Sequence, residues 1–168
     1  MTAQSSPNTP LLFTPTKLRG LEIRNRIMAS PMCQYNSDDG GPNDWHMMHL
    51  GRLAIGGCGI VFGEETAVEP DGRKTHSCAG LYHQSHIAAY RRLTDMIKQH
   101  GAIPAIQLGH SGRKGSCHGA IEDWRPLTAK DAKNGLPPWQ IMTPSAAISP
   151  PRPIPPKEMD HDDIKRVI

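Results

Sequence analysis

The sequence lacks paired cysteines, has few aromatic side chains and contains no long apolar run. Its four cysteines, Cys33, Cys58, Cys78 and Cys117, lie far apart without a C-x-x-C pair, so neither a disulfide framework nor a metal site is expected. Aromatic residues make up 5% of the chain, and no apolar run approaches the roughly 18 residues of a membrane span. The formal net charge is only +3 and its basic residues are scattered, so we expect neither nucleic acid nor a membrane as a partner.

Two further motifs are missing from the sequence. The first ten residues are polar and lack the charged and apolar regions of a secretory signal, so we expect a disordered arm over residues 1–10 and a cytoplasmic protein with reduced thiols. There is also no G-x-G-x-x-G loop, because the glycines at 56, 57 and 59 precede a predicted strand instead of following it. This argues against a Rossmann domain.

What the chain does contain is an alternation of short apolar runs and amphipathic segments. Three apolar runs predict buried strands: Arg26–Met32, Cys58–Gly63 and Ile103–Leu108. Apolar residues at helical spacing predict one helix over residues 45–57, capped by Asn43 or Asp44, and a second helix over Ser85–His100. Strand starts that are roughly 30 to 40 residues apart are typical of βαβ units, which place parallel strands under helices.

The remaining segments are less regular. Residues 11–26 favour a short hairpin or an extended entry segment, and Glu64–Ser77 reads as a polar excursion. Eight of the 16 prolines fall between Pro137 and Pro156, so the tract 109–156 is predicted to be a long loop excursion instead of one regular element. A last helix is predicted from Asp160, whose carboxylate can cap it.

Polar and reactive side chains follow each predicted strand, at the edge where parallel α/β folds place function. The segments concerned are Ser30–Tyr35, Glu64–Ala67 and Gln107–Lys114. A thiol, Cys33, stands two residues before a phenol, Tyr35, and the Gln107 amide can both donate to and accept from the edge of a heterocycle. By spacing alone, each of the three is more often a structural residue: a buried thiol, a core aromatic or a satisfied strand end.

Seven stretches of the sequence occur in the same order in one known family. They are LFTPTKLRGLEIRNRI, SPMCQY, NDWHMMHLGRLAIGG, AVEPDGR, IQLGHSGRK, TPSAAI and PKEMDHDDI. Through them the chain resembles the Old Yellow Enzyme family of flavin-dependent ene-reductases, in the bacterial branch that includes xenobiotic reductases. The resemblance implies a TIM (β/α)8 barrel with FMN over the carboxyl ends of the strands. Residues 11–168 would then hold roughly the first three βα units, the N-terminal part of such a barrel.

The resemblance also assigns roles to individual positions. Ser30, Pro31, Met32 and Cys33 match the segment that runs along the flavin, where the cysteine tunes the redox potential. Tyr35 matches a tyrosine on the substrate side, and Gln107 a glutamine that hydrogen-bonds the flavin pyrimidine.

One flavin-neighbouring position departs from the family pattern. The branch has Glu-Ala where this chain has Glu64-Glu65. The backbone of Glu65 can still contact the cofactor, but a second carboxylate there would disfavour flavin reduction.

The resemblance to the Old Yellow Enzyme family implies an FMN-dependent NAD(P)H oxidoreductase of the ene-reductase type. Hydride would pass from NAD(P)H to the flavin and then to the C=C bond of an α,β-unsaturated carbonyl compound, and a full-length protein is open to homo-oligomerisation. The alternative from another class is a non-catalytic barrel remnant that binds a partner through exposed strand edges. The cations Arg113 and Lys114 fit either an anionic cofactor or a solvated turn, and no role is assigned to His110.

Overall fold

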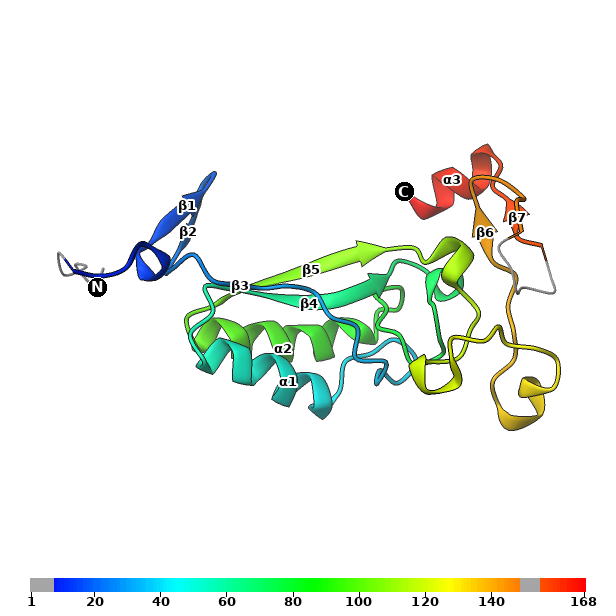
Figure 1. The fold of residues 1–168 in the computed structure, drawn as a ribbon, viewed down its shortest axis with the longest axis horizontal. Coiled ribbons are helices and arrows are strands. Elements are labelled where there is room, and N and C mark those ends of the chain that lie inside the picture. Colours follow the sequence, from blue (N-terminus) through cyan, green and yellow to red (C-terminus); the bar gives the residue numbers. More distant parts are fainter. Residues whose placement is uncertain (1–7, 149–154) are drawn as a thin grey trace.

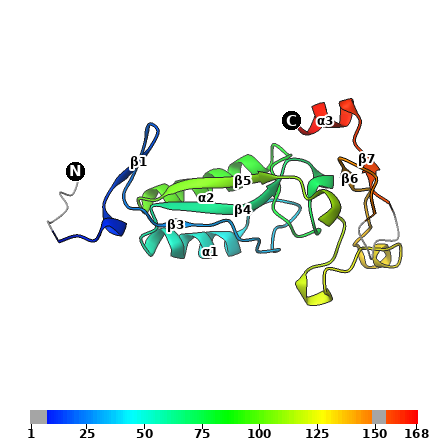
Figure 2. The same cartoon turned by 45° about the horizontal axis from the view of Figure 1, so that its top comes forward.

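The computed structural model describes residues 8–148 and 155–168, and its centre is a three-stranded parallel sheet in the order β3-β4-β5 (Figure 1). The strands are β3 Met28–Ala29, β4 Ile60–Ala67 and β5 Ile103–Gly109. The helices α1 Asp44–Ile55 and α2 His86–Gln99 connect them and lie side by side on one face of the sheet (Figure 2). The predicted order of strand, helix, strand, helix, strand is confirmed. The predicted arm, except for residues 8–10, lies outside the described residues.

Two of the predicted strands have other bounds than expected. Strand β4 does not end at Gly63 but continues to Ala67, paired with β5 from Ile60↔Ile103 to Ala67↔Gly109 with a register shift between Gly63 and Glu65. The polar residues after Gly63 remain in the strand because its backbone is still paired and the two glutamates find side-chain partners. Strand β3 is shorter than predicted, since only Met28 and Ala29 pair with β4.

The hydrophobic core lies between the sheet and the two helices. Val61 of β4 and Ala54 of α1 are completely buried. The other buried members come from α1, α2 and the turn before β5: Leu50, Leu93, Ile97 and Ala102. Each large side chain of this kind contributes about 1.5–3 kcal/mol by leaving water. Of the two predicted caps of helix α1, Asn43 is the one observed: its side chain accepts from the Trp45 amide in a capping box with His46, so the helix begins at Asp44, one residue earlier than predicted.

The N-terminal hairpin, β1 Thr16–Leu18 with β2 Leu21–Ile23, leads directly into an arginine that caps both helices. The Arg24 guanidinium donates to the carbonyl of Ala54 at 2.8 Å and to that of His100 at 2.7 Å. It also donates to the Cys58 carbonyl, at 2.8 and 3.2 Å. A cation at the C-termini of two helices donates hydrogen bonds to their terminal carbonyls and interacts favourably with the negative ends of their dipoles.

The tract after β5 has no long element. Three 3-10 helices, Gly112–Lys114, Ala120–Glu122 and Asp131–Asn134, precede the two-stranded parallel pair of β6 Met142–Thr143 and β7 Lys157–Glu158. Helix α3 His161–Val167 then begins, with Asp160 accepting from two backbone amides as predicted. Figure 1 places this tract at the carboxyl ends of β4 and β5 and the hairpin at the opposite end. None of the helices described combines the length and apolar character needed to cross a bilayer.

Candidate functional site

The predicted site residues gather where the parallel strands end. Because β3, β4 and β5 run in the same direction, their carboxyl ends meet at one edge of the sheet. Ser30 and Met32, just past β3, are exposed, and Pro31 is half-buried between them. This segment therefore offers side chains and backbone to a ligand lying across the edge.

The segment that carries Cys33 and Tyr35 is held in place by Glu64. The Glu64 Oε2 accepts from the backbone amide of Gln34 at 3.0 Å, and its Oε1 lies 3.2 Å from His46 Nε2, outside hydrogen-bond geometry. Both side chains of this pair are 4% exposed. The sequence analysis assigned no role to Glu64. Two adjacent glutamates directly after an apolar run could have indicated a buried carboxylate with a structural partner.

A lysine joins two of the predicted site residues. Lys74 Nζ donates to Glu65 Oε2 at 2.5 Å and lies 3.8 Å from Cys33 Sγ. Burial alone would lower the pKa of Lys74, but the hydrogen bond to Glu65 and the charges nearby raise it above its ordinary value. Ser111 Oγ donates to the other Glu65 oxygen at 3.4 Å. The Glu65 carboxylate, unexpected from the family pattern, is thus neutralised by a neighbouring ammonium group.

Glycine at position 109 makes room for this arrangement. A Cβ there would lie 2.8 Å from the Cγ of Glu65 and 3.0 Å from its Oε1. Any side chain at Gly109 would displace the Glu65 carboxylate from its partners.

Tyr35 lies beside Cys33 in an uncommon backbone conformation. Its φ is +52°, in the left-handed region that bulky residues rarely adopt. Burial, and then the neighbouring Cys33 thiol, raise the pKa of the Tyr35 phenol above its ordinary value. The ring packs edge-to-face on Trp124 with centroids 5.1 Å apart. The phenol therefore remains protonated at neutral pH and can donate a hydrogen bond.

Gln107 lies opposite Glu65 in the β4–β5 register. Its side chain is exposed and has no hydrogen-bond partner among the described residues. An amide that is left open at a strand end presents one acceptor and two donor hydrogens to a ligand.

The other polar residues predicted near this edge have structural partners. His110 Nδ1 accepts from the Gly112 amide, so its Nε2 donates to Glu69 at 3.1 Å. Arg166 of α3 donates to the same carboxylate. Arg113 donates to the carbonyls of Ser145 and Ala147, both at 3.1 Å, while Lys114 is exposed.

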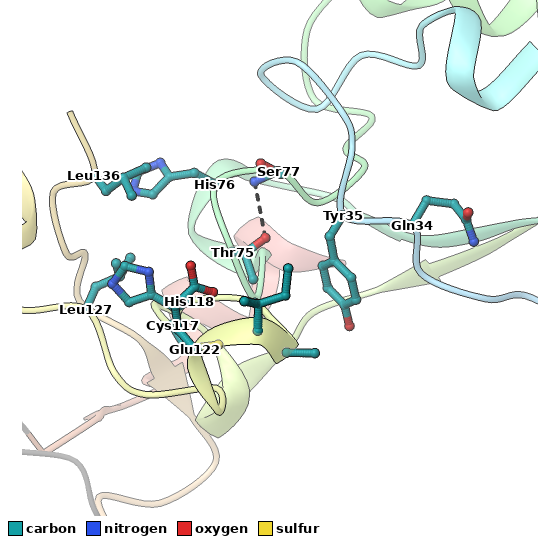
Figure 3. Close-up of a pocket in the computed structure, with 13 residues that line it drawn as sticks. Gln34, Tyr35, Thr75, His76, Ser77, Cys117, His118, Glu122, Leu127 and Leu136 are labelled. Atoms are coloured by element: carbon teal, nitrogen blue, oxygen red, sulfur yellow. Dashed lines mark hydrogen bonds between the residues drawn. The ribbon is translucent and has the colours of Figure 1, made fainter. Parts of the chain in front are cut away.

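A pocket of about 410 Å³ borders this site on the side of Tyr35 (Figure 3). One wall comes from Gln34, Tyr35 and the segment 75–77, and the other from the tract between Cys117 and Leu136. Sequence reasoning did not find this pocket, because its far wall belongs to the irregular tract after β5.

The far wall is organised around Asp131, which is 6% exposed. Its carboxylate accepts two hydrogen bonds from the Arg125 guanidinium, at 3.0 and 3.2 Å, and one from His118 Nε2 at 3.0 Å. The backbone amide and the hydroxyl of Thr128 each donate to it at 2.8 Å. One carboxylate thus replaces regular secondary structure as the support of this loop.

We expect Asp131→Ala to loosen the loop. Tryptic cleavage after Lys133 should accelerate at least tenfold, because five hydrogen bonds lose their acceptor. Arg125, Thr128 and His118 hold the pKa of Asp131 well below its usual range. The stabilisation is therefore full above the ordinary carboxyl pKa of about 3.9 and is lost as pH falls towards the lowered value.

The matched control is Asp95→Ala, which removes an exposed carboxylate from α2. Timed digestion followed by mass spectrometry measures both variants at pH 7. Equal cleavage rates in the two variants would contradict the role assigned to Asp131.

Comparison with known sequences decides the family. The profile of the NADH:flavin oxidoreductase / NADH oxidase family matches residues 11–168. The chain belongs to this family. The resemblance to Old Yellow Enzyme seen in the sequence motifs is thereby confirmed.

Curated members of the NADH:flavin oxidoreductase / NADH oxidase family align with the chain over much of its length. It is 41% identical over 113 residues to an NADPH dehydrogenase of Geobacillus sp. (strain WCH70), covering 66% of this chain and 33% of that protein. It is 38% identical over 144 residues to the NADH:flavin oxidoreductase FG08077 of Gibberella zeae, covering 85% and 34%. The chain therefore spans about a third of the length of these relatives.

Solved structures agree on the fold of this family member. Morphinone reductase superposes with a TM-score of 0.74 at 22% identity, over 97% of this chain and 43% of that one. The structure of TcOYE with pHBA gives a TM-score of 0.57 at 28% identity, over 64% of this chain and 29% of that one. The predicted fold class, α/β with βα units of a TIM barrel, is confirmed.

Proposed function

We propose that the chain contributes the flavin edge of an FMN-dependent NAD(P)H oxidoreductase that reduces the C=C bond of α,β-unsaturated carbonyl compounds. The observation that carries this proposal is the convergence of Cys33, Glu65 and Gln107 at one edge of the sheet, with the Gln107 amide left open by all the described residues. Family membership supports the oxidoreductase class.

The residues present fit a flavin. A pyrimidine edge alternates donors and acceptors, and the Gln107 amide supplies the complementary set. The exposed segment Ser30–Met32 can lie along the ring system, with Cys33 directly after it. Lys74 offsets the negative charge of Glu65. The Glu65 carboxylate then no longer disfavours the reduced, electron-rich flavin ring. When bound, FMN would accept hydride from NAD(P)H and pass it to the β-carbon of the substrate.

Tyr35 supplies a hydrogen-bond donor on the substrate side of this arrangement. Its raised pKa keeps the phenol protonated through the neutral range, and the neighbouring Cys33 links it to the proposed flavin segment. Glu64 acts as a positioning residue for both, because it holds the backbone between them. The chain's own residues would thus bind and orient the reactants, whereas the electron transfer would be the cofactor's.

The experiment is to purify the protein, titrate it with FMN and add NADPH followed by cyclohex-2-enone. We expect a yellow complex whose flavin absorbance bleaches with NADPH and returns with the enone. Gln107→Leu should weaken FMN binding about tenfold. It removes one or two hydrogen bonds of about 1 kcal/mol each, and about 1.4 kcal/mol corresponds to a factor of ten.

Gln99→Leu serves as the matched control, since it removes an exposed glutamine at the end of α2. Flavin fluorescence quenching gives the dissociation constant of each variant. A protein that binds no FMN, or equal constants for the two variants, would refute the proposed site.

A further inference from the structure

The pocket beside Tyr35 has the size of a ligand site rather than a packing defect. Its volume is about 410 Å³, within the roughly 300–1,000 Å³ of small-molecule pockets. A dry apolar cavity of about 150 Å³ already holds benzene, so this pocket has room for more than one ring.

The walls of the pocket are suited to an apolar ring. Leu127 and Leu136 line it, and Ile121 at its border is a residue that is 98% exposed. Two histidines also line it, but each uses a ring nitrogen elsewhere: His76 Nε2 with the Pro137 carbonyl at 2.9 Å, and His118 Nε2 with Asp131. Figure 3 shows Leu127 and His118 on the other side of the pocket from Tyr35.

Two aromatic residues with left-handed backbone meet on the Tyr35 side of the pocket. Trp124 has a φ of +56° and Tyr35 a φ of +52°, and their rings meet edge-to-face at 5.1 Å. Left-handed backbone is disfavoured at a bulky residue and persists only where surrounding contacts impose it. Here both residues with this backbone conformation contribute their rings to the same edge-to-face contact.

We propose that this pocket binds an apolar ring substituent of the substrate, and so selects substrates that carry such a ring near their reducible end. The inference rests on the proposed function for the position of the reacting end near Cys33. The ring substituent would extend past Tyr35 and Trp124 and lie against Leu136. Edge-to-face packing of aromatic rings favours a planar ring over a flexible alkyl chain at this place.

The test compares 4-phenylcyclohex-2-enone with cyclohex-2-enone in the wild type and in Leu136→Trp, which fills the pocket from its half-buried far wall. We expect the ratio of kcat/KM for the phenyl compound to that for cyclohex-2-enone to fall about tenfold in the variant. Binding of the non-reducible 4-phenylcyclohexanone, measured by calorimetry, should weaken by a similar factor. Leu136→Phe, a smaller enlargement, should give an intermediate effect if the tryptophan variant does not fold.

Ile55→Trp is the matched control, because Ile55 is 68% exposed at the far end of α1. Its ratio and its calorimetric constant should equal those of the wild type. An unchanged ratio and unchanged binding in folded Leu136 variants would overturn the ring pocket. If the wild type reduces neither enone, the proposed function fails, while the calorimetric comparison still decides whether the pocket holds a ring.

Discussion

Replacing Glu64 by alanine is expected to lower the free energy of unfolding by about 3 kcal/mol, the usual result of removing one partner from a buried ionisable pair. The Glu64 carboxylate is 4% exposed and accepts from the Gln34 amide. Without it, that amide loses its acceptor and the His46 ring faces an empty space inside the protein. The measurement is urea denaturation followed by circular dichroism.

The matched control for this variant is Glu22→Ala. Its pair, Lys17–Glu22, joins the two hairpin strands at 3.1 Å, but both side chains are 70% exposed. Exposed pairs contribute about 0–1 kcal/mol, so this variant should be nearly as stable as the wild type. Equal losses in the two variants would mean that burial of the Glu64 pair is unimportant.

The second large effect is expected from Lys74→Met. It leaves the Glu65 carboxylate with a single donor, Ser111 Oγ at 3.4 Å, and with an uncompensated charge. A negative charge near the proposed flavin favours the oxidised over the reduced ring. The midpoint potential should therefore fall by about 30 mV or more, which for two electrons corresponds to a tenfold change in relative affinity.

The double variant Lys74→Met with Glu65→Gln separates charge from shape. It removes both charges and should restore the potential of the wild type, as measured by spectroelectrochemistry. Lys165→Met removes an equivalent cation that is 78% exposed on α3, and should leave the potential unchanged. A shift in the Lys165 variant as large as that in the Lys74 variant would contradict the pairing argument.

Local chemistry explains which parts of the fold could be read from the sequence. The caps at Asn43 and Asp160 were predicted because a side-chain oxygen and the amides that it accepts from lie within three residues of one another. The helix periodicity and the parallel strand order follow in the same way from patterns of a few residues. The extension of β4 to Ala67 could not be predicted, because polar residues after Gly63 usually indicate a loop.

The site was only partly predictable for a related reason. Cys33, Tyr35 and Gln107 stand at strand ends, so their position at one edge follows from topology alone. Their partners do not: Lys74 reaches Cys33 over 41 positions, and Trp124 packs on Tyr35 from the irregular tract after β5. Such contacts depend on how loops return to the sheet, for which the sequence has no short-range signal. The roles assigned to the site residues all remain predictions: Ser30, Pro31, Met32, Cys33, Tyr35, Glu65 and Gln107.

The contacts of Arg24 restrict which substitutions the molecule tolerates at the hairpin end of the sheet. One planar guanidinium holds the ends of α1 and α2 and the turn before β4 at once, an arrangement that the single ammonium group of lysine cannot reproduce. The end of the sheet near the hairpin is therefore fixed by a residue with no conservative substitute. At the opposite end of the sheet, single carboxylates hold the loops in place. Insertions and exchanges that alter substrate preference should accumulate at that loop end, while the hairpin end keeps the helices in register.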